Sequence, residues 1–273
     1  MHEHLRHRSS ARTDIKSTSG LPLTPVPMSD ENTIIFYDIP SKIGAWSPNT
    51  WKTRYSLNFK GIPYKTVWIE YPDIEKTLKE LGIAASATKA DGKTPHYTLP
   101  AIYDPSTKTG LTESLAIAEY LDKKYPDKPL LIPRGTTALH KAWITSLVPV
   151  LGTLRQFTLP RTAEILNPSS EEYFRRTRRE MLQMSLEEFL PKGEKKIEEW
   201  SKVEAGLGRL DAWYKKEDTL VMGDEACFAD FALGGFLVWV RIIFGKDSQE
   251  WKDLSSWQDG RWGRMIQALE KYE

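Results

Sequence analysis

The chain of 273 residues is long enough for one large domain or two ordinary ones, and 40% of its residues are hydrophobic, enough to bury substantial cores. A formal net charge of +1 argues against nucleic acid or an anionic membrane as a main partner. The single cysteine allows no internal disulfide, and no apolar run reaches the ~20 residues that span a bilayer, so the sequence predicts a cytoplasmic protein that does not enter membranes.

Residues 1–32 differ in composition from the rest of the chain, because they are rich in serine and proline and contain no aromatic residue. Such a segment cannot bury enough surface to offset the entropy lost on ordering, so we expect a flexible N-terminal extension. Met28 stands just ahead of the first predicted strand and is a second candidate start site. The histidines in this extension lack the spacing of a metal site, and no metal is expected.

Residues 33–125 alternate between short β-branched or aromatic runs and amphipathic segments. Trp51, Tyr55 and Phe59 recur at every fourth position, which predicts a helix between two strands. Because a helix connects them, these two strands are expected to be parallel. In chain order the pattern predicts a strand at 33–38, a helix at 49–60, a strand at 64–70, a helix at 73–81, a loop at 84–94, strands at 101–104 and around Leu111, and a helix at 113–124. This β-α-β-α-β-β-α order is a thioredoxin-like arrangement.

A proline-rich linker at 126–134 precedes a second domain at 135–273, in which every long segment has helical periodicity. The segment around Cys227 has the pattern of an N-capping box, with Asp230 three residues beyond the cap position. A thiol is a weak hydrogen-bond acceptor, so we expect a weak cap and a buried, unreactive Cys227. The helices of this all-α domain are predicted at 136–151, 171–189, 194–216, 229–244 and 263–272.

Three dipeptides at fixed places in this pattern carry a family resemblance. They are Ser47-Pro48 before the first helix, Leu99-Pro100 before the third strand and Glu113-Ser114 at the start of the third helix. Together with the helical domain that follows, they resemble the glutathione transferase superfamily over residues 33–273. Finer detail, in the segments 38–40, 47–53 and 97–104, is similar to the fungal branch related to bacterial β-etherases.

The resemblance implies that these motifs bind glutathione. Glu113 would pair with the ammonium of its γ-glutamyl end, while Ser114 and the free N–H groups of the helix N-terminus would bind the adjacent carboxylate. Leu99 would pair its backbone with the cysteine of glutathione, since the equivalent proline in the family follows a cis peptide bond. Lys52 and His96 are further candidates near the glycyl carboxylate, although a solvated surface position is the ordinary expectation for such side chains.

Ser47 is the residue that the resemblance places at the glutathione thiol. A free thiol has a pKa of about 8.5, and a hydroxyl beside a helix N-terminus stabilises the reactive thiolate. Asn49 and Thr50, in the same first turn, are alternatives for this role, and Tyr37 at the end of the first strand is a rival hydroxyl. The alternative for Ser47 itself is a helix-cap serine with no chemistry.

The second substrate is expected where the loop before the first helix meets the helical domain. Aromatic and aliphatic side chains there would bind aromatic ligands by buried area and stacking. The alternative is that the same side chains pack the core between the two domains. The candidates are Trp46, Trp143, Leu147 and Phe157.

The sequence therefore predicts a glutathione transferase that takes glutathione as co-substrate and conjugates it to hydrophobic, aromatic electrophiles in a detoxifying reaction. The etherase-like branch adds attack on aryl ethers. A non-catalytic carrier of aromatic ligands, or a regulatory binding protein of the same fold, is the alternative. A thiol-based redox enzyme is disfavoured because Cys227 lies far along the chain from the first helix. The resemblance also implies a homodimer.

Overall fold

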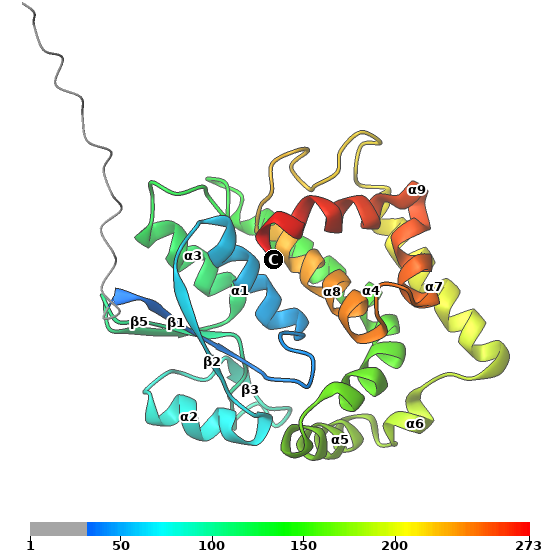
Figure 1. Ribbon diagram of the computed structural model, residues 1–273, viewed down its shortest axis with the longest axis horizontal. Helices are drawn as coiled ribbons and strands as arrows, with labels where there is room; N and C mark the ends of the chain where they lie inside the picture. The colour runs from blue at the N-terminus through cyan, green and yellow to red at the C-terminus, as the bar shows by residue number, and fades with distance from the viewer. Residues whose placement is uncertain (1–31) are drawn as a thin grey trace, which may run out of the picture.

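The computed structural model describes residues 32–273, so the extension predicted over 1–32 lies outside the described residues except for its last position. The described chain has a sheet with helices on both faces, followed by helices alone (Figure 1). The predicted fold class, a thioredoxin-like domain followed by an all-α domain, is confirmed.

The sheet of the first domain has four strands in the order β2-β1-β5-β6. Strands β1 and β2 are parallel, as the sequence predicts, while β5 runs antiparallel to β1 and β6 antiparallel to β5. Helices α1 and α3 cover one face and α2 covers the other (Figure 1). The bounds are β1 Ile34–Asp38, α1 Pro48–Phe59, β2 Tyr64–Trp68, a 3-10 turn η2 Tyr71–Asp73, α2 Ile74–Glu80, β5 Ala101–Asp104, β6 Thr109–Thr112 and α3 Ser114–Lys124.

The segment predicted as a loop at 84–94 opens into a short hairpin instead, formed by β3 Ala87–Thr88 and β4 Pro95–His96. Its turn is held by Asp91, whose carboxylate accepts hydrogen bonds from the backbone N–H groups of Lys93 at 2.9 Å and Thr94 at 2.8 Å. Such side-chain-to-backbone bonds favour turns over helix, which explains why the segment doubles back.

The second domain is built around α8, which is buried on almost every side and packs against α1, α4 and α9. A helix that is apolar all round belongs in the core of a domain. Figure 1 shows α8 running between α1 of the first domain and the remaining helices of the second. The bounds are α4 Thr137–Ile165, α5 Pro168–Leu182, α6 Leu186–Phe189, α7 Gly193–Asp211, α8 Phe228–Phe244, α9 Gln249–Leu269 and a 3-10 turn η3 Glu270–Tyr272.

Two helices extend well beyond their predicted ends. Helix α4 continues through Pro149 and Pro160, although a proline inside a helix costs about 3 kcal/mol. Burial of apolar residues such as Leu154 and Phe157 outweighs that cost. Helix α9 begins at Gln249 rather than at 263. A kink at residues 257–260 interrupts the helical spacing, so the sequence pattern indicates only the second half of the helix.

The helix predicted over 171–189 is two helices. Gln183 adopts a left-handed backbone conformation with φ 57° and ends α5. Ser185 then caps the short α6, because its hydroxyl accepts a hydrogen bond from the backbone N–H of Glu188 at 3.2 Å. A left-handed C-cap ends one helix and a capping box begins the next. Together these two local signals outweigh the continuous helical pattern of the sequence.

Candidate functional site

Ser47 occupies the N-cap of α1 and is buried, with 3% of its surface exposed. Its carbonyl oxygen accepts hydrogen bonds from the backbone N–H of Trp51 at 3.0 Å and from the hydroxyl of Thr50 at 3.1 Å. Its own hydroxyl forms no hydrogen bond with any residue in the range 32–273. The α1 N-terminus therefore keeps both a hydroxyl and backbone donors for an external group.

Serine also begins two other helices, and there it behaves differently. Ser185 accepts a bond from the backbone N–H of Glu188 at 3.2 Å, and Ser248 accepts one from Trp251 at 3.1 Å. All three serines have extended N-cap backbones, so the residue type and its conformation do not explain the difference. Ser47 is thus in the position of a helix cap without making the capping bond.

Of the two polar residues that follow Ser47 in the first turn, Thr50 points into the protein and Asn49 points to solvent. Thr50 is fully buried, and its hydroxyl is engaged by the Ser47 carbonyl. Asn49 is exposed, and its Oδ1 accepts a hydrogen bond from the Nζ of Lys52 at 3.0 Å. Tyr37 is buried in the sheet, where burial raises the pKa of its phenol and Tyr103 raises it further. Of the four alternatives, Asn49 is exposed, and Ser47 is buried but keeps a hydroxyl that bonds to no residue within 32–273.

Lys52 joins α1 to α8 and to the start of α3. Its ammonium lies 4.8 Å from the ring centroid of Phe236 in α8. Burial lowers the pKa of Lys52 to about 8, and the negative charge of Glu113 opposes that effect. The Phe236 contact was not foreseen from the sequence, because it joins residues from the two domains.

Glu113 is the N-cap of α3 and is exposed, with a positive φ of 71° that is rare outside glycine. Its side chain makes no capping bond, so the first N–H groups of α3, beginning at Ser114, are also left open. A strained backbone at an exposed carboxylate is more often found at binding sites than elsewhere.

The Leu99–Pro100 peptide bond is cis, as the resemblance implies. It lies directly before β5, whose first residue Ala101 pairs with Tyr37 at the end of β1. The backbone N–H of Leu99 has no hydrogen-bond partner in the part of the chain that the structure describes. His96 lies in β4 near Glu75 of α2, and its contacts do not bring it to Ser47.

The α1 N-terminus is pressed against α8 at Gly235. A Cβ added there would lie 2.5 Å from the carbonyl oxygen of Pro48, so only glycine permits this approach. The signal in the sequence is the pair Gly234-Gly235 inside an otherwise apolar helical run.

The four apolar candidates are buried side chains, although Phe157 also lines a cavity of about 470 Å³. Trp46 contacts Tyr71 at a ring-centroid distance of 6.3 Å, Phe157 packs on Trp200, and the indole N–H of Trp143 bonds to a backbone carbonyl in α8. This arrangement agrees with the alternative that these side chains fill the space within and between the domains. None of the four exposes more than 8% of its surface: Trp46, Trp143, Leu147 and Phe157.

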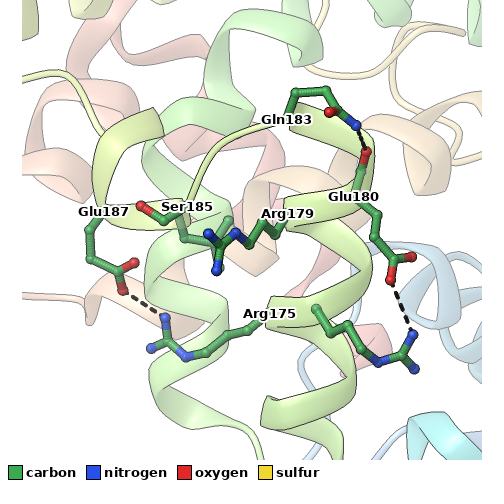
Figure 2. Close-up of a pocket in the computed structure, with 8 residues that line it drawn as sticks. Arg175, Arg179, Glu180, Gln183, Ser185 and Glu187 are labelled. Carbon is green, nitrogen blue, oxygen red and sulfur yellow. Dashed lines mark hydrogen bonds and ion pairs between the residues drawn. The ribbon is translucent and has the colours of Figure 1, made fainter.

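Two cavities lie elsewhere on the molecule. One of about 730 Å³ is lined by charged residues of α5 and α6, including Arg175 and Glu187, whose side chains meet at 2.7 Å (Figure 2). The other, of about 620 Å³, lies at the opposite end of α1 from Ser47 and is lined by Phe59, Cys227 and Tyr272 among others. Neither includes the residues at the α1 and α3 N-termini.

Cys227 is buried at the N-terminus of α8. The carboxylate of Asp230 accepts hydrogen bonds from the backbone N–H groups of Cys227 at 2.9 Å and Val221 at 2.7 Å. Burial raises the pKa of Asp230 to about 6 and raises the pKa of the Cys227 thiol well above its ordinary value. Cys227 is therefore part of a structural cap, because it supplies no thiolate at neutral pH.

Within residues 32–273, no group of three or more His, Cys, Asp or Glu side chains is placed to hold a metal ion. None of the helices in that range combines the length and the apolar character needed to cross a bilayer.

Comparison with known proteins places these features in one family. A model described as the glutathione S-transferase N-terminal domain matches residues 46–124, and one described as the C-terminal domain matches residues 138–272. The glutathione S-transferase-like protein ustS of Aspergillus flavus is 32% identical over 89% of this chain and 93% of its own length.

Solved structures agree with this result. A glutathione S-transferase of Ceriporiopsis subvermispora, in complex with glutathione, is 47% identical with a TM-score of 0.85, covering 89% of this chain and 98% of its own. The glutathione transferase GSTFuA3 of Phanerochaete chrysosporium is 44% identical with a TM-score of 0.82, covering 88% of this chain and 97% of its own.

Proposed function

This chain belongs to the glutathione S-transferase family, and on that premise we propose that it binds glutathione, activates its thiol through Ser47 and transfers it to aromatic electrophiles. The observation that carries the proposal is the free hydroxyl of Ser47 at an uncapped helix N-terminus. A solved relative 47% identical to this chain was crystallised with glutathione, which supports the choice of ligand.

The thiol is activated by stabilising its anion. The Ser47 hydroxyl donates a hydrogen bond to the sulfur, and the unpaired N–H groups and positive end of the α1 dipole add to this stabilisation. Asn49 lies two residues after Ser47 and is exposed. Its Oδ1 already accepts a hydrogen bond from Lys52, so Asn49 serves as a secondary contact to the thiol. The proton leaves to solvent, and the thiolate is the attacking group.

The tripeptide lies across three backbone features. Glu113 pairs with its ammonium, and the open N–H groups at the start of α3 bind the adjacent carboxylate. The free N–H of Leu99 pairs with the cysteine backbone of glutathione in the manner of an added strand. Lys52 supplies a positive charge close enough to interact with Glu113.

The chemical step is a nucleophilic substitution. The thiolate sulfur forms a bond to the electrophilic carbon, and the bond from that carbon to the leaving group breaks, with its electron pair departing as halide or, for an aryl ether, as an oxygen anion that takes a proton from water. The etherase-like part of this proposal rests on the resemblance of segments 38–40, 47–53 and 97–104 to that fungal branch.

The test compares wild type with Ser47→Ala, using glutathione and chlorodinitrobenzene. A lost hydrogen bond to a charged sulfur predicts a fall in kcat/KM of about 10- to 100-fold. The ultraviolet absorbance of the bound thiolate, followed against pH, must show a higher thiol pKa in the variant. Ser185→Ala is the matched control, because it removes another N-cap serine far from α1.

Two outcomes would contradict the proposal. Ser47→Ala with the wild-type rate and thiol pKa would remove Ser47 from the mechanism. Absence of turnover with every electrophile in a panel, while fluorescent aromatic dyes still bind, would favour the carrier alternative. The proposal also includes a homodimer and a cytoplasmic location, which light scattering of the purified protein and microscopy of the tagged full chain would test.

A further inference from the structure

Two arginines share the face of the α4–α5 pair that looks toward the first domain. Arg155 precedes Leu159 and Ala163 at intervals of four on α4, and both of these are buried against residues of the first domain. Residues at this spacing lie on one side of a helix, so Arg155 extends the same face beyond the buried part.

On α5, Arg178 follows Ser170 and Phe174 at the same spacing. The Ser170 hydroxyl accepts a hydrogen bond from the backbone N–H of Tyr71 at 2.9 Å. Phe174 packs on the Tyr71 ring at a centroid distance of 5.7 Å. Arg178 is therefore the next residue along the seam between the domains, at the point where these contacts end.

The seam leads back to the proposed thiol site. The Tyr71 ring lies 6.3 Å from Trp46, the residue immediately before Ser47. Burial raises the pKa of the Tyr71 hydroxyl, and Arg178 opposes that rise, which agrees with the guanidinium lying on this side of Tyr71. Tyr71 therefore has Trp46, the neighbour of Ser47 in the chain, and Arg178 beside it.

The two arginines have no acidic partner in the part of the chain that the structure describes. No carboxylate forms an ion pair with Arg155 or Arg178 anywhere in the described range 32–273. Arg178 stacks over Phe174 at 4.3 Å. Within residues 32–273 it donates only to the neutral hydroxyl of Thr177, at 3.2 Å, and its buried Nε has no partner. The one hydrogen bond of the Arg155 side chain in that range is to the sulfur of Met181, at 3.9 Å.

The other arginines of α5 show the contrast. Arg175 pairs with Glu187 at 2.7 Å (Figure 2). Arg176 pairs with Glu180 at 3.4 Å. Those charges are matched within the protein. Burial lowers the pKa of Arg155, and the neighbouring charge of Arg178 lowers it further, so the unmatched pair carries a repulsion that an anion would relieve.

We propose that Arg155 and Arg178 bind the carboxylate of an acidic aromatic electrophile, so that the preferred second substrates are aryl carboxylates rather than neutral hydrocarbons. This inference rests on the proposed transferase function and names its substrate class. Arginine suits the role because its planar fork matches both oxygens of a carboxylate.

The first experiment measures binding without chemistry. Dinitrobenzoate and its neutral methyl ester, which have no leaving group, are titrated against the full chain, with quenching of tryptophan fluorescence as the signal. Wild type is expected to bind the acid about tenfold more tightly than the ester, as charged hydrogen bonds imply. Arg155→Gln and Arg178→Gln are each expected to remove most of this preference, and Arg176→Gln to leave it intact.

The second experiment measures turnover of chlorodinitrobenzoate and its methyl ester with glutathione. The arginine variants are expected to raise KM for the acid by about tenfold and to leave the ester unchanged. Arg155 is exposed, so its variant keeps the packing even if Arg178→Gln lowers the melting temperature.

Equal binding of acid and ester by wild type, or an equal loss of both in Arg155→Gln, would overturn the carboxylate site. Binding preference without any turnover would instead reject the transferase proposal and leave the anion site standing. The two failures are therefore distinguishable.

Discussion

Helices α1 and α8 pack against each other across the domain boundary, yet their N-termini are used in opposite ways. The N-cap of α8 is Cys227, and the carboxylate of Asp230 accepts hydrogen bonds from the backbone N–H groups of Cys227 and Val221 at 2.9 and 2.7 Å. The N-cap of α1 is Ser47, whose hydroxyl makes no hydrogen bond with the described residues 32–273. The α8 N-terminus is therefore closed, because a side chain of the protein accepts hydrogen bonds there. The α1 N-terminus is open, because no side chain in that range caps it.

The difference separates stability from binding. Buried backbone donors that lack a partner are costly, so a closed N-terminus such as that of α8 stabilises the fold. Donors that the fold leaves unpaired add no stability until a ligand arrives, and they then bind an anion. Because α8 packs on α1 at Gly235, the closed end helps to fix the position of the open one.

Substitutions at the two helix N-termini should give the largest difference in stability. Asp230→Ala leaves two backbone donors without their acceptor and should lower the free energy of unfolding by about 3 kcal/mol. Ser47→Ala removes no internal bond and should change it by less than about 0.5 kcal/mol. Urea unfolding of both variants measures the difference. A large loss for Ser47→Ala would show that its hydroxyl closes α1 after all.

The contact between the two helices gives the next largest effect. Gly235→Ala places a methyl group 2.5 Å from the Pro48 carbonyl oxygen, so α1 must shift away from α8. Overpacking of this kind costs about 1–3 kcal/mol, and the displaced Ser47 should lower kcat/KM as well.

The matched control is Gly152→Ala in α4, where an added Cβ meets no atom within 4 Å. Replacement of a glycine inside a helix should stabilise that variant by up to about 1 kcal/mol. Thermal unfolding and chlorodinitrobenzene turnover compare the two. If Gly235→Ala unfolds like wild type, the close approach does not position the α1 N-terminus.

The parts of the fold that the sequence predicts are those with local causes. The order of strands and helices in the first domain follows from short apolar runs and helical spacing, and the candidate residues Ser47, Leu99 and Glu113 stand in dipeptides that are visible without a structure. The hairpin at β3 and β4 was missed because its strands have only two residues each.

The features that the sequence does not predict depend on tertiary packing. Pro149 and Pro160 signal an end to α4, and only burial in the domain core keeps the helix intact. Arg155 and Arg178 lie close enough to interact only because α4 and α5 run antiparallel to each other. Nothing near either residue in the sequence signals it, since surface arginines are common in helices.

The smallest effect expected concerns the charge beside the open end. Burial lowers the pKa of Lys52 to about 8 from its ordinary value of 10.5, so the free protein loses this positive charge as the pH rises through 8. S-methylglutathione has two carboxylates and no thiol to titrate, so it binds better to the charged form. Its affinity should fall a few-fold between about pH 7 and pH 9.

The α-ammonium of the ligand also titrates near the top of this range, which makes a variant necessary. In Lys52→Gln the part due to the protein should vanish, and affinity at pH 7 should equal that of wild type at pH 9 once the ligand's own titration is subtracted. Calorimetric titrations of both proteins measure this. Parallel pH profiles for the two would show that Lys52 interacts with Asn49 and Phe236 alone and that the open N-terminus of α1 binds its ligand without help from this charge.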